Sequence, residues 1–87
     1  MATHLITYDL RDQSKEKDLL EYLRETLGAE KVTESSYLTT TEHSASDIVR
    51  EIRRITDDAI EVYVLRVDGW SGYGPKSVNE MIGRHLG

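Results

Sequence analysis

Hydrophobic and polar positions along the first third of the chain change from a strand pattern to a helical one. Residues 3–10 are rich in β-formers and predict a first strand that ends near Asp9. From about residue 13, leucines recur at spacings of three and four, which predicts an amphipathic helix facing a core. Asp12 or Ser14 can cap the start of this helix, and Gly28 can end it.

The middle of the chain repeats this strand and helix order. Residues 31–41 lack helical periodicity and predict a second strand or a bent pair of strands. Ser44 followed by Asp47 is a capping pattern, and isoleucines spaced three and four apart then predict a helix ending near Thr56. Residues 60–67 predict the strongest strand, which is apolar on both faces and therefore needs cover on both sides.

The order of these elements predicts an α+β sandwich of the ferredoxin-like type (βαββαβ), with both helices on one face of the sheet. A glycine and aromatic loop over residues 68–75 and a short helix over residues 77–85 follow. Because such a sandwich leaves one sheet face bare, the apolar second face of the last strand predicts cover by another protomer.

Composition narrows the class of protein. With 87 residues the chain has room for a single domain, residues 1–87, and the 38% apolar and 31% charged fractions are those of a globular domain. The net charge of −5, from 11 basic and 16 acidic residues, argues against a broadly basic nucleic-acid coat, although a local basic groove remains possible. The pattern predicts no membrane span or signal peptide and favours a cytoplasmic protein.

Several kinds of site are excluded by residue type and spacing. The absence of Cys removes disulfides, thiolate metal sites and a cysteine nucleophile. The three histidines are too scattered for a zinc site. The glycines after residue 68 match neither a dinucleotide fingerprint nor a phosphate loop, and there is no Gly-x-Ser-x-Gly elbow.

Three segments carry a family resemblance, in the order that the fold requires: LITYDL at residues 5–10, ESSYL at 34–38 and DDAIEVYVL at 57–65. They resemble segments of the small dimeric CRISPR-associated ferredoxin-like ribonucleases of the adaptation machinery, and of the related virulence-associated ribonuclease toxins. The chain is more similar still to uncharacterised stand-alone SinR-like relatives, which begin with a similar Thr-His-Leu-Ile-x-Tyr-Asp-Leu.

This resemblance implies a homodimer with sheets face to face, and a metal-dependent endonuclease in which Asp9 of each protomer binds the metal at the interface. The chain also departs from the family. Where the family has arginines at the start of the first helix, this chain has Lys15 and Lys17, with Arg11 just before. The family's final strand, which crosses to the partner's sheet, is replaced by the glycine and aromatic loop and a predicted helix.

Asp9 is the leading candidate for catalysis and for metal binding. Carboxylate oxygens hold Mg²⁺ or Mn²⁺, which polarises a phosphodiester and lowers the pKa of a bound water. One carboxylate per chain makes a sparse site, so Asp9 needs its symmetry mate or Asp12 to complete it. The alternative role for Asp9 is to cap the turn after the strand. Tyr8 and Ser36 can orient a substrate by hydrogen bonding, or can fill a half-buried strand face.

Two further groups are candidates for binding RNA, DNA or a protein partner. Arg50, Arg53 and Arg54 form a cationic stripe on the second helix that can contact phosphates, or a solvated face neutralised by nearby carboxylates. Trp70 and Tyr73 can stack on bases, anchor a protein, or cover the core. The sequence therefore leaves two hypotheses: a homodimeric metal-dependent endonuclease, and a catalytically inactive dimeric module that docks a protein or nucleic acid.

Overall fold

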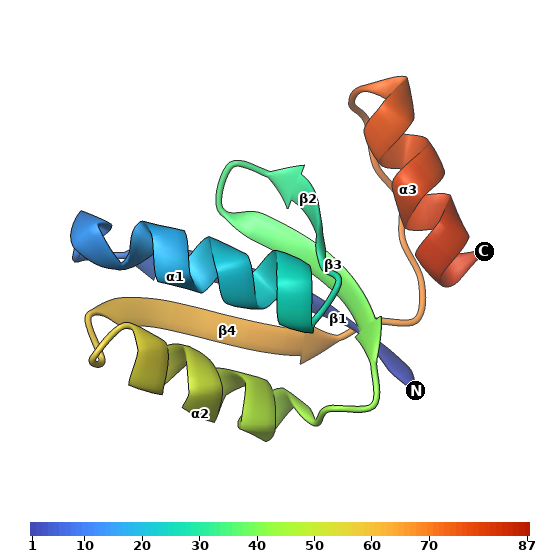
Figure 1. Cartoon of the computed structure of the whole chain (residues 1–87). Coiled ribbons are helices and arrows are strands. Elements are labelled where there is room, and N and C mark those ends of the chain that lie inside the picture. The colour runs from blue at the N-terminus through green and yellow to red at the C-terminus, as the bar shows by residue number, and fades with distance from the viewer.

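Two helical segments lie on one face of a four-stranded antiparallel sheet in the computed structural model, which describes all 87 residues (Figure 1). The strand order is β2-β3-β1-β4, so the two longest strands lie next to each other. This order and the helix placement confirm the predicted ferredoxin-like α+β class. The strands are β1 (Ala2–Leu10), β2 (Glu30–Thr33), β3 (Ser36–Thr41) and β4 (Ile60–Arg66).

The first helical segment is composite. It starts with a 3-10 turn, η1 (Gln13–Lys15), continues as α1 (Glu16–Glu21) and ends in a π-helical turn, η2 (Tyr22–Thr26). Asp12 caps the start, because its carboxylate accepts a hydrogen bond from the Ser14 N–H at 3.0 Å. Gly28 ends the segment at φ 60°, a conformation that side chains disfavour. Both ends therefore agree with the prediction.

The other two helices also begin and end near their predicted limits. In α2 (Ala45–Ile55), the Ser44 hydroxyl accepts a hydrogen bond from the Asp47 N–H at 3.1 Å. The turn after α2 contains Asp57 and Asp58, both at positive φ, a backbone region in which Asp is tolerated. The last helix is α3 (Lys76–Leu86). No helix in the structure combines the length and apolar character needed to cross a bilayer.

Residues 31–41 form the bent pair of strands that was one of the two predicted alternatives. A hydrogen-bonded turn at residues 34–35 separates β2 from β3, and the pairing contains an irregularity between Lys31 and Thr33. The Ser36 hydroxyl accepts a hydrogen bond from the Thr33 N–H at 3.1 Å and so closes this turn. The polar side chains of Thr33 and Ser36 thus stabilise a change of chain direction.

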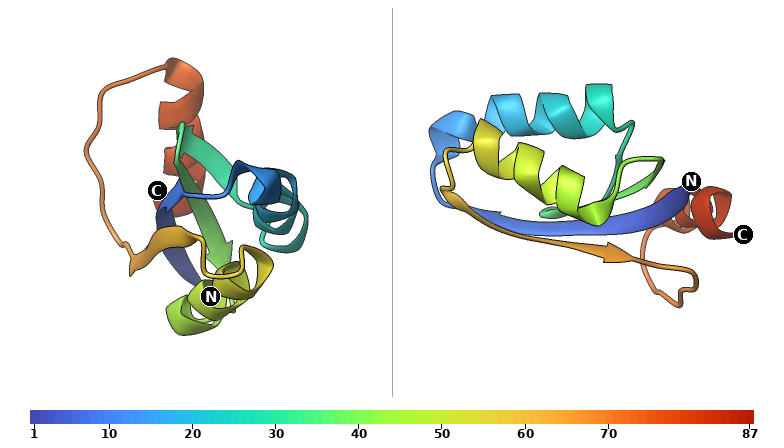
Figure 2. Two further views of the ribbon diagram at one scale, coloured as in Figure 1. Left: turned by 90° about the vertical axis from the view of Figure 1, so that its left-hand side faces the viewer. Right: turned by 90° about the horizontal axis from the view of Figure 1, so that it is seen from below.

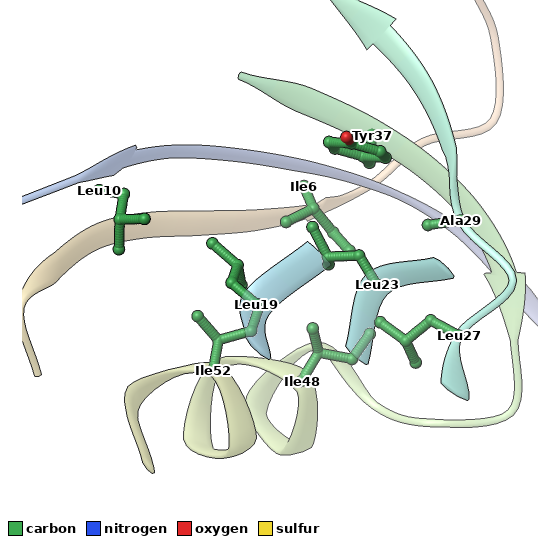
Figure 3. Packing of buried hydrophobic residues seen from close by; sticks show 9 residues of the cluster. All are labelled: Ile6, Leu10, Leu19, Leu23, Leu27, Ala29, Tyr37, Ile48 and Ile52. Carbon is green, nitrogen blue, oxygen red and sulfur yellow. The ribbon is translucent and has the colours of Figure 1, made fainter. Parts of the chain in front are cut away.

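The core lies between the sheet and the helical segments (Figure 3). Ile6 and Leu10 project into it from β1, because alternate residues of a strand face the same side. The helices contribute residues spaced three and four apart, which place one stripe toward the sheet. The buried cluster contains Ile6, Leu10, Leu19, Leu23, Leu27, Ala29, Tyr37, Ile48 and Ile52.

The expectation that the second sheet face is bare needs correction. Figure 2 shows α3 on the side of the sheet opposite α1 and α2, and it packs against β2 and β3. Met81 is buried, and the His85 Nδ1 lies 2.8 Å from the Thr40 hydroxyl. Only the β1 and β4 half of this face stays open, with Tyr63 64% exposed and Leu65 48% exposed. The α3 helix of the same chain therefore covers the β2 and β3 half of the sheet face that was predicted to be covered by a second protomer.

Truncating the core residue Ile52 tests this packing. Ile52 is fully buried, so Ile52→Ala should lower the free energy of unfolding by about 2–5 kcal/mol through lost burial and the remaining cavity. Urea unfolding followed by far-UV circular dichroism measures this loss. Glu25→Ala, on the exposed surface of η2, is the control and should change the value by less than about 0.5 kcal/mol. Equal effects of the two substitutions would contradict the assigned core.

Candidate functional site

Strand alternation determines which candidate residues share a face. Asp9 and Thr7 of β1 lie on the open face, in register with Glu61 and Tyr63 of β4. Together with the apolar side chain of Leu65, they make up the half of the sheet that α3 leaves uncovered. We call this surface the open half-sheet. It presents a carboxylate pair at one end and exposed apolar side chains beyond it.

The Asp9 side chain is exposed and unpartnered. No hydrogen bond or ion pair within the chain engages its carboxylate. Its cross-strand neighbour Glu61 is paired with Arg11 at 3.1 Å. The capping role that was the alternative explanation for Asp9 belongs to Asp12, which accepts hydrogen bonds from Ser14 N–H and Oγ–H at 3.0 and 2.6 Å. Asp9 therefore has no structural task in the isolated chain.

The carboxylate of Asp9 has the donor type that a hard divalent cation prefers, but one chain supplies too few such groups. No cluster of three or more His, Asp or Glu side chains that could hold a metal ion occurs in the structure. Asp12 is engaged by Ser14, and these hydrogen bonds hold the pKa of its carboxyl below the usual range. The Asp12 carboxylate is therefore already used by the helix cap.

Tyr8 lies on the other face of the sheet from Asp9. Its ring stacks on that of Tyr37 with centroids 6.4 Å apart, and it packs against the core cluster. Burial raises the pKa of the Tyr8 phenol, and the neighbouring Tyr37 adds to the effect. Adjacent residues of a strand point in opposite directions, so Tyr8 and Asp9 do not meet within the chain.

Ser36 is on the same face as Asp9 but is used locally. It pairs in register with Thr7, two residues before Asp9 along β1. Its hydroxyl is hydrogen-bonded to both the N–H and the hydroxyl of Thr33, and the residue is buried. Ser36 therefore holds the turn between β2 and β3.

The cationic stripe of α2 is neutralised by neighbouring carboxylates. Arg50 pairs with Asp47 at 2.8 Å, and Arg53 pairs with Asp58 at 2.7 Å. Arg54 pairs with Glu51, and this hydrogen bond raises the pKa of Arg54 and lowers that of Glu51. All three arginines are exposed and far from the open half-sheet, on a helix that covers the other face of the sheet. This arrangement is typical of a solvated helix surface.

The cations at the start of the first helical segment are also largely engaged. Arg11 is paired with Glu61, and Lys15 is paired with Asp57 at 3.0 Å. The contact with Asp57 raises the pKa of Lys15. Lys17 is exposed and has no ion pair. Of these three cations, Lys17 is therefore the one without a carboxylate partner.

Trp70 and Tyr73 lie on the loop between β4 and α3. Trp70 is 41% exposed, and Tyr73 is fully exposed. The loop, α3 and the sheet enclose a hollow of about 410 Å³ that both aromatic residues line, with Leu5 and Leu38 on the sheet side. The sequence identified the aromatic loop as a candidate. It gave no indication of the ion pair between Arg84 and Glu30, which are far apart in the chain and which hold α3 over the sheet.

Comparison with known proteins gives a fold relationship. No protein-family model matches the chain, and no curated protein matches it. Its structure is similar to the crystal structure of a hypothetical protein, TT1823, from Thermus thermophilus, with a TM-score of 0.64. The two sequences are 24% identical, and the match covers 85% of this chain and 94% of that chain. This similarity supports the ferredoxin-like architecture and, at this identity, shows the fold alone.

The different roles of Asp9 and Asp12 can be separated by stability measurements. Asp12→Ala should lower the urea midpoint at neutral pH because it removes the cap of η1, whereas Asp9→Ala should leave the midpoint unchanged. The pKa of Asp12 is lowered on folding, so the cap contributes fully above the ordinary value of 3.8 and is lost as the pH falls through the lowered pKa.

The difference in midpoint between wild type and Asp12→Ala should therefore narrow as the pH is reduced below 3.8. Urea titrations at a series of pH values measure it. A loss of stability in Asp9→Ala as large as that in Asp12→Ala would assign a structural role to Asp9.

Proposed function

We propose that this chain forms a homodimer that hydrolyses phosphodiester bonds in RNA with the help of Mg²⁺ or Mn²⁺, and that Asp9 of each protomer binds the metal. The exposed, unpartnered carboxylate of Asp9 is the observation that carries this proposal. A charged group without a structural task, at the edge of an apolar surface, is available for a ligand. Residues 5–10 resemble the first strand of the CRISPR-associated ribonucleases, and this resemblance supports metal binding by the same residue, Asp9.

The open half-sheet supports the proposed dimer. Tyr63 and Leu65 are large apolar side chains exposed beside each other along β4, and a second copy of the chain would remove them from water. In a two-fold symmetric association the same surface is used by both copies. If the axis passes near the end of β1, the two Asp9 carboxylates approach each other and supply oxygen ligands that one chain lacks.

The residues of the chain have simple tasks in this reaction. Asp9 holds the cation, Glu61 adds negative charge beside it, and Arg11 pairs with Glu61. A divalent cation bound there would polarise the phosphodiester and lower the pKa of an attacking water. Tyr8 acts indirectly by packing the other face of the same strand, which maintains the position of Asp9.

The dimer is tested by placing a charge on the open half-sheet. Leu65→Glu and Tyr63→Glu should each convert a dimer into a monomer of 9.9 kDa, because a buried unpaired carboxylate at the interface is costly. Light scattering after size-exclusion chromatography measures the mass. Thr26→Glu, exposed on the helical side, is the matched control and should keep the dimer. A wild-type protein that is already monomeric at micromolar concentration would contradict the proposal.

The nuclease is tested with a labelled mixed pool of RNA and DNA, incubated with Mn²⁺ or with EDTA. Wild type should cut the RNA only with the metal, and Asp9→Ala should lose cutting while it keeps its mass and fold. Asp68→Ala, at another exposed and unpartnered aspartate, is the matched control and should cut normally. Cutting by Asp9→Ala at the wild-type rate would rule out the proposed site.

A second candidate function is a dimeric module that docks a protein or nucleic acid without catalysis. The exposed Tyr73 and Trp70 around the hollow between the loop and α3 favour it, because aromatic residues on loops often anchor partners. The arginines of α2 add little support to this second function, because each is already paired with a carboxylate. Binding of the labelled pool without turnover, lost in Tyr73→Ala and kept in Asp9→Ala, would distinguish this function from the nuclease.

A further inference from the structure

The hollow between the sheet, the loop over residues 68–75 and α3 has three walls. The sheet contributes Leu5 and Leu38, and α3 contributes Val78, Ile82 and Leu86, which are spaced four apart and so form one stripe of the helix. Figure 2 shows the loop arching from the end of β4 to the start of α3, on the side of the sheet opposite α1 and α2. Its volume of about 410 Å³ lies within the range of about 300–1,000 Å³ that is typical of small-molecule sites. We call it the α3 hollow.

No charged side chain lines the α3 hollow. Its 16 lining residues include no Asp, Glu, Lys, Arg or His, although 31% of the residues of the chain are charged. Of its polar side chains, Thr33 is hydrogen-bonded to Ser36, and Asn79 donates to the Gly74 carbonyl at 3.3 Å. A charged ligand would lose its hydration here without gaining a counter-charge, so the hollow favours an uncharged one.

Two aromatic side chains of the loop line the hollow and keep part of their surface in water. Trp70 is 41% exposed, and Tyr73 is fully exposed. The Trp70 ring lies against Gly72, with its Cε3 and Cζ3 atoms 3.5 Å from the place that a Cβ of residue 72 would occupy, so the loop itself positions the ring. Aromatic rings pack favourably on one another in stacked or edge-to-face arrangements. A ligand that contains a ring would therefore bury aromatic surface that the chain leaves exposed.

The loop has few hydrogen bonds of its own. The Val67 N–H donates to the Thr3 carbonyl, and the next backbone donor along the chain is the Val78 N–H, which donates to the Pro75 carbonyl. The position of residues 68–74 thus depends on side-chain packing around the hollow. Segments held by few backbone hydrogen bonds open and shift at low cost in free energy, so this wall can adjust to an occupant.

We propose that the α3 hollow binds a small, uncharged, mainly apolar molecule that contains one aromatic ring or two fused rings. The ligand lies between Trp70 on the loop, Leu5 and Leu38 on the sheet, and the apolar stripe of α3. Removing these surfaces from water drives binding. RNA and DNA do not fit, because no cation in the hollow neutralises a phosphate. The ligand therefore differs in class from the substrate and partners of the two functions considered above.

The test compares naphthylmethanol with naphthoate, two probes that share a ring system and differ in charge. The chain has a single Trp, so the indole N–H of Trp70 gives one resonance in two-dimensional NMR spectra and reports on the hollow directly. Naphthylmethanol should shift this resonance saturably. Naphthoate should bind about tenfold more weakly or less, because its carboxylate is desolvated without a partner.

The position of the site is tested by filling the hollow. Val78→Phe enlarges a side chain that lines it and should weaken naphthylmethanol binding about tenfold or more. Ser77→Phe adds the same ring at an exposed position of α3 outside the hollow, and it should bind as the wild type does. Tyr73→Ala is a second test that leaves the core untouched, because Tyr73 is fully exposed, and it should also weaken binding. Asp9→Ala should bind the probe normally, whatever its effect on RNA cleavage.

Three results would overturn the proposal. The first is the absence of a saturable shift of the Trp70 indole resonance, or equal affinities for the two probes. The second is a loss of affinity in Tyr63→Ala as large as that in Val78→Phe, which would mean that the probe binds exposed apolar surface in general. The third is binding only at protein concentrations at which the chain is monomeric, which would mean that a second copy fills the hollow.

Discussion

The pairing of β1 with β3 on one side and β4 on the other is the constraint on which the rest of the structure depends. It places Ile6 opposite both Tyr37 and Val64, and so sets which side of each strand faces the helices. A slip by one residue would turn Ile6 outward and bring Asp9 into the core. The buried cluster under α1 and α2 therefore also determines that the Asp9 carboxylate faces the open side.

A few polar contacts fix α3 over one half of the sheet face that lies opposite α1 and α2. Glu30 binds Arg84 and His85, and the other nitrogen of His85 meets Thr40, which holds α3 over β2 and β3. The Arg84 and Glu30 side chains are partly exposed, so their ion pair orients α3 more than it stabilises it, whereas the His85 side chain is largely buried. The β1 and β4 half stays uncovered, and its apolar residues are next to Asp9. Placement of the C-terminal helix thus limits any partner to one half of the sheet.

Two polar groups without a partner in the chain, on Asp9 and His4, lie at opposite ends of the central strand. Asp9 is at its C-terminal end on the open face, and His4 is near its N-terminal end on the helix-covered face. Arg66, opposite His4 in the register of β1 and β4, is the one arginine without a side-chain partner, and Glu42 lies near it, so the charges at this end of the strand are mixed.

Local patterns in the sequence were enough to predict most of the fold. The caps at Asp12 and Ser44, the stop at Gly28 and the turn at residues 57–58 are decided by neighbouring residues, so each could be read from the chain. Apolar residues at both even and odd positions of residues 60–67 likewise predicted a strand with two apolar faces. These features depend on periodicity and backbone preference, which act over a few residues.

The sites depended on contacts between distant residues. The sequence singled out Tyr8, Ser36 and the arginines of α2, but tertiary packing placed Tyr8 across the sheet from Asp9 and gave Ser36 and each arginine a partner. It missed the unpaired state of His4 and Arg66 for the same reason. By itself the sequence determined the order, limits and core-facing sides of the elements. Only the tertiary structure decided which polar groups are free, because a side chain's partner is set by positions far away in the chain.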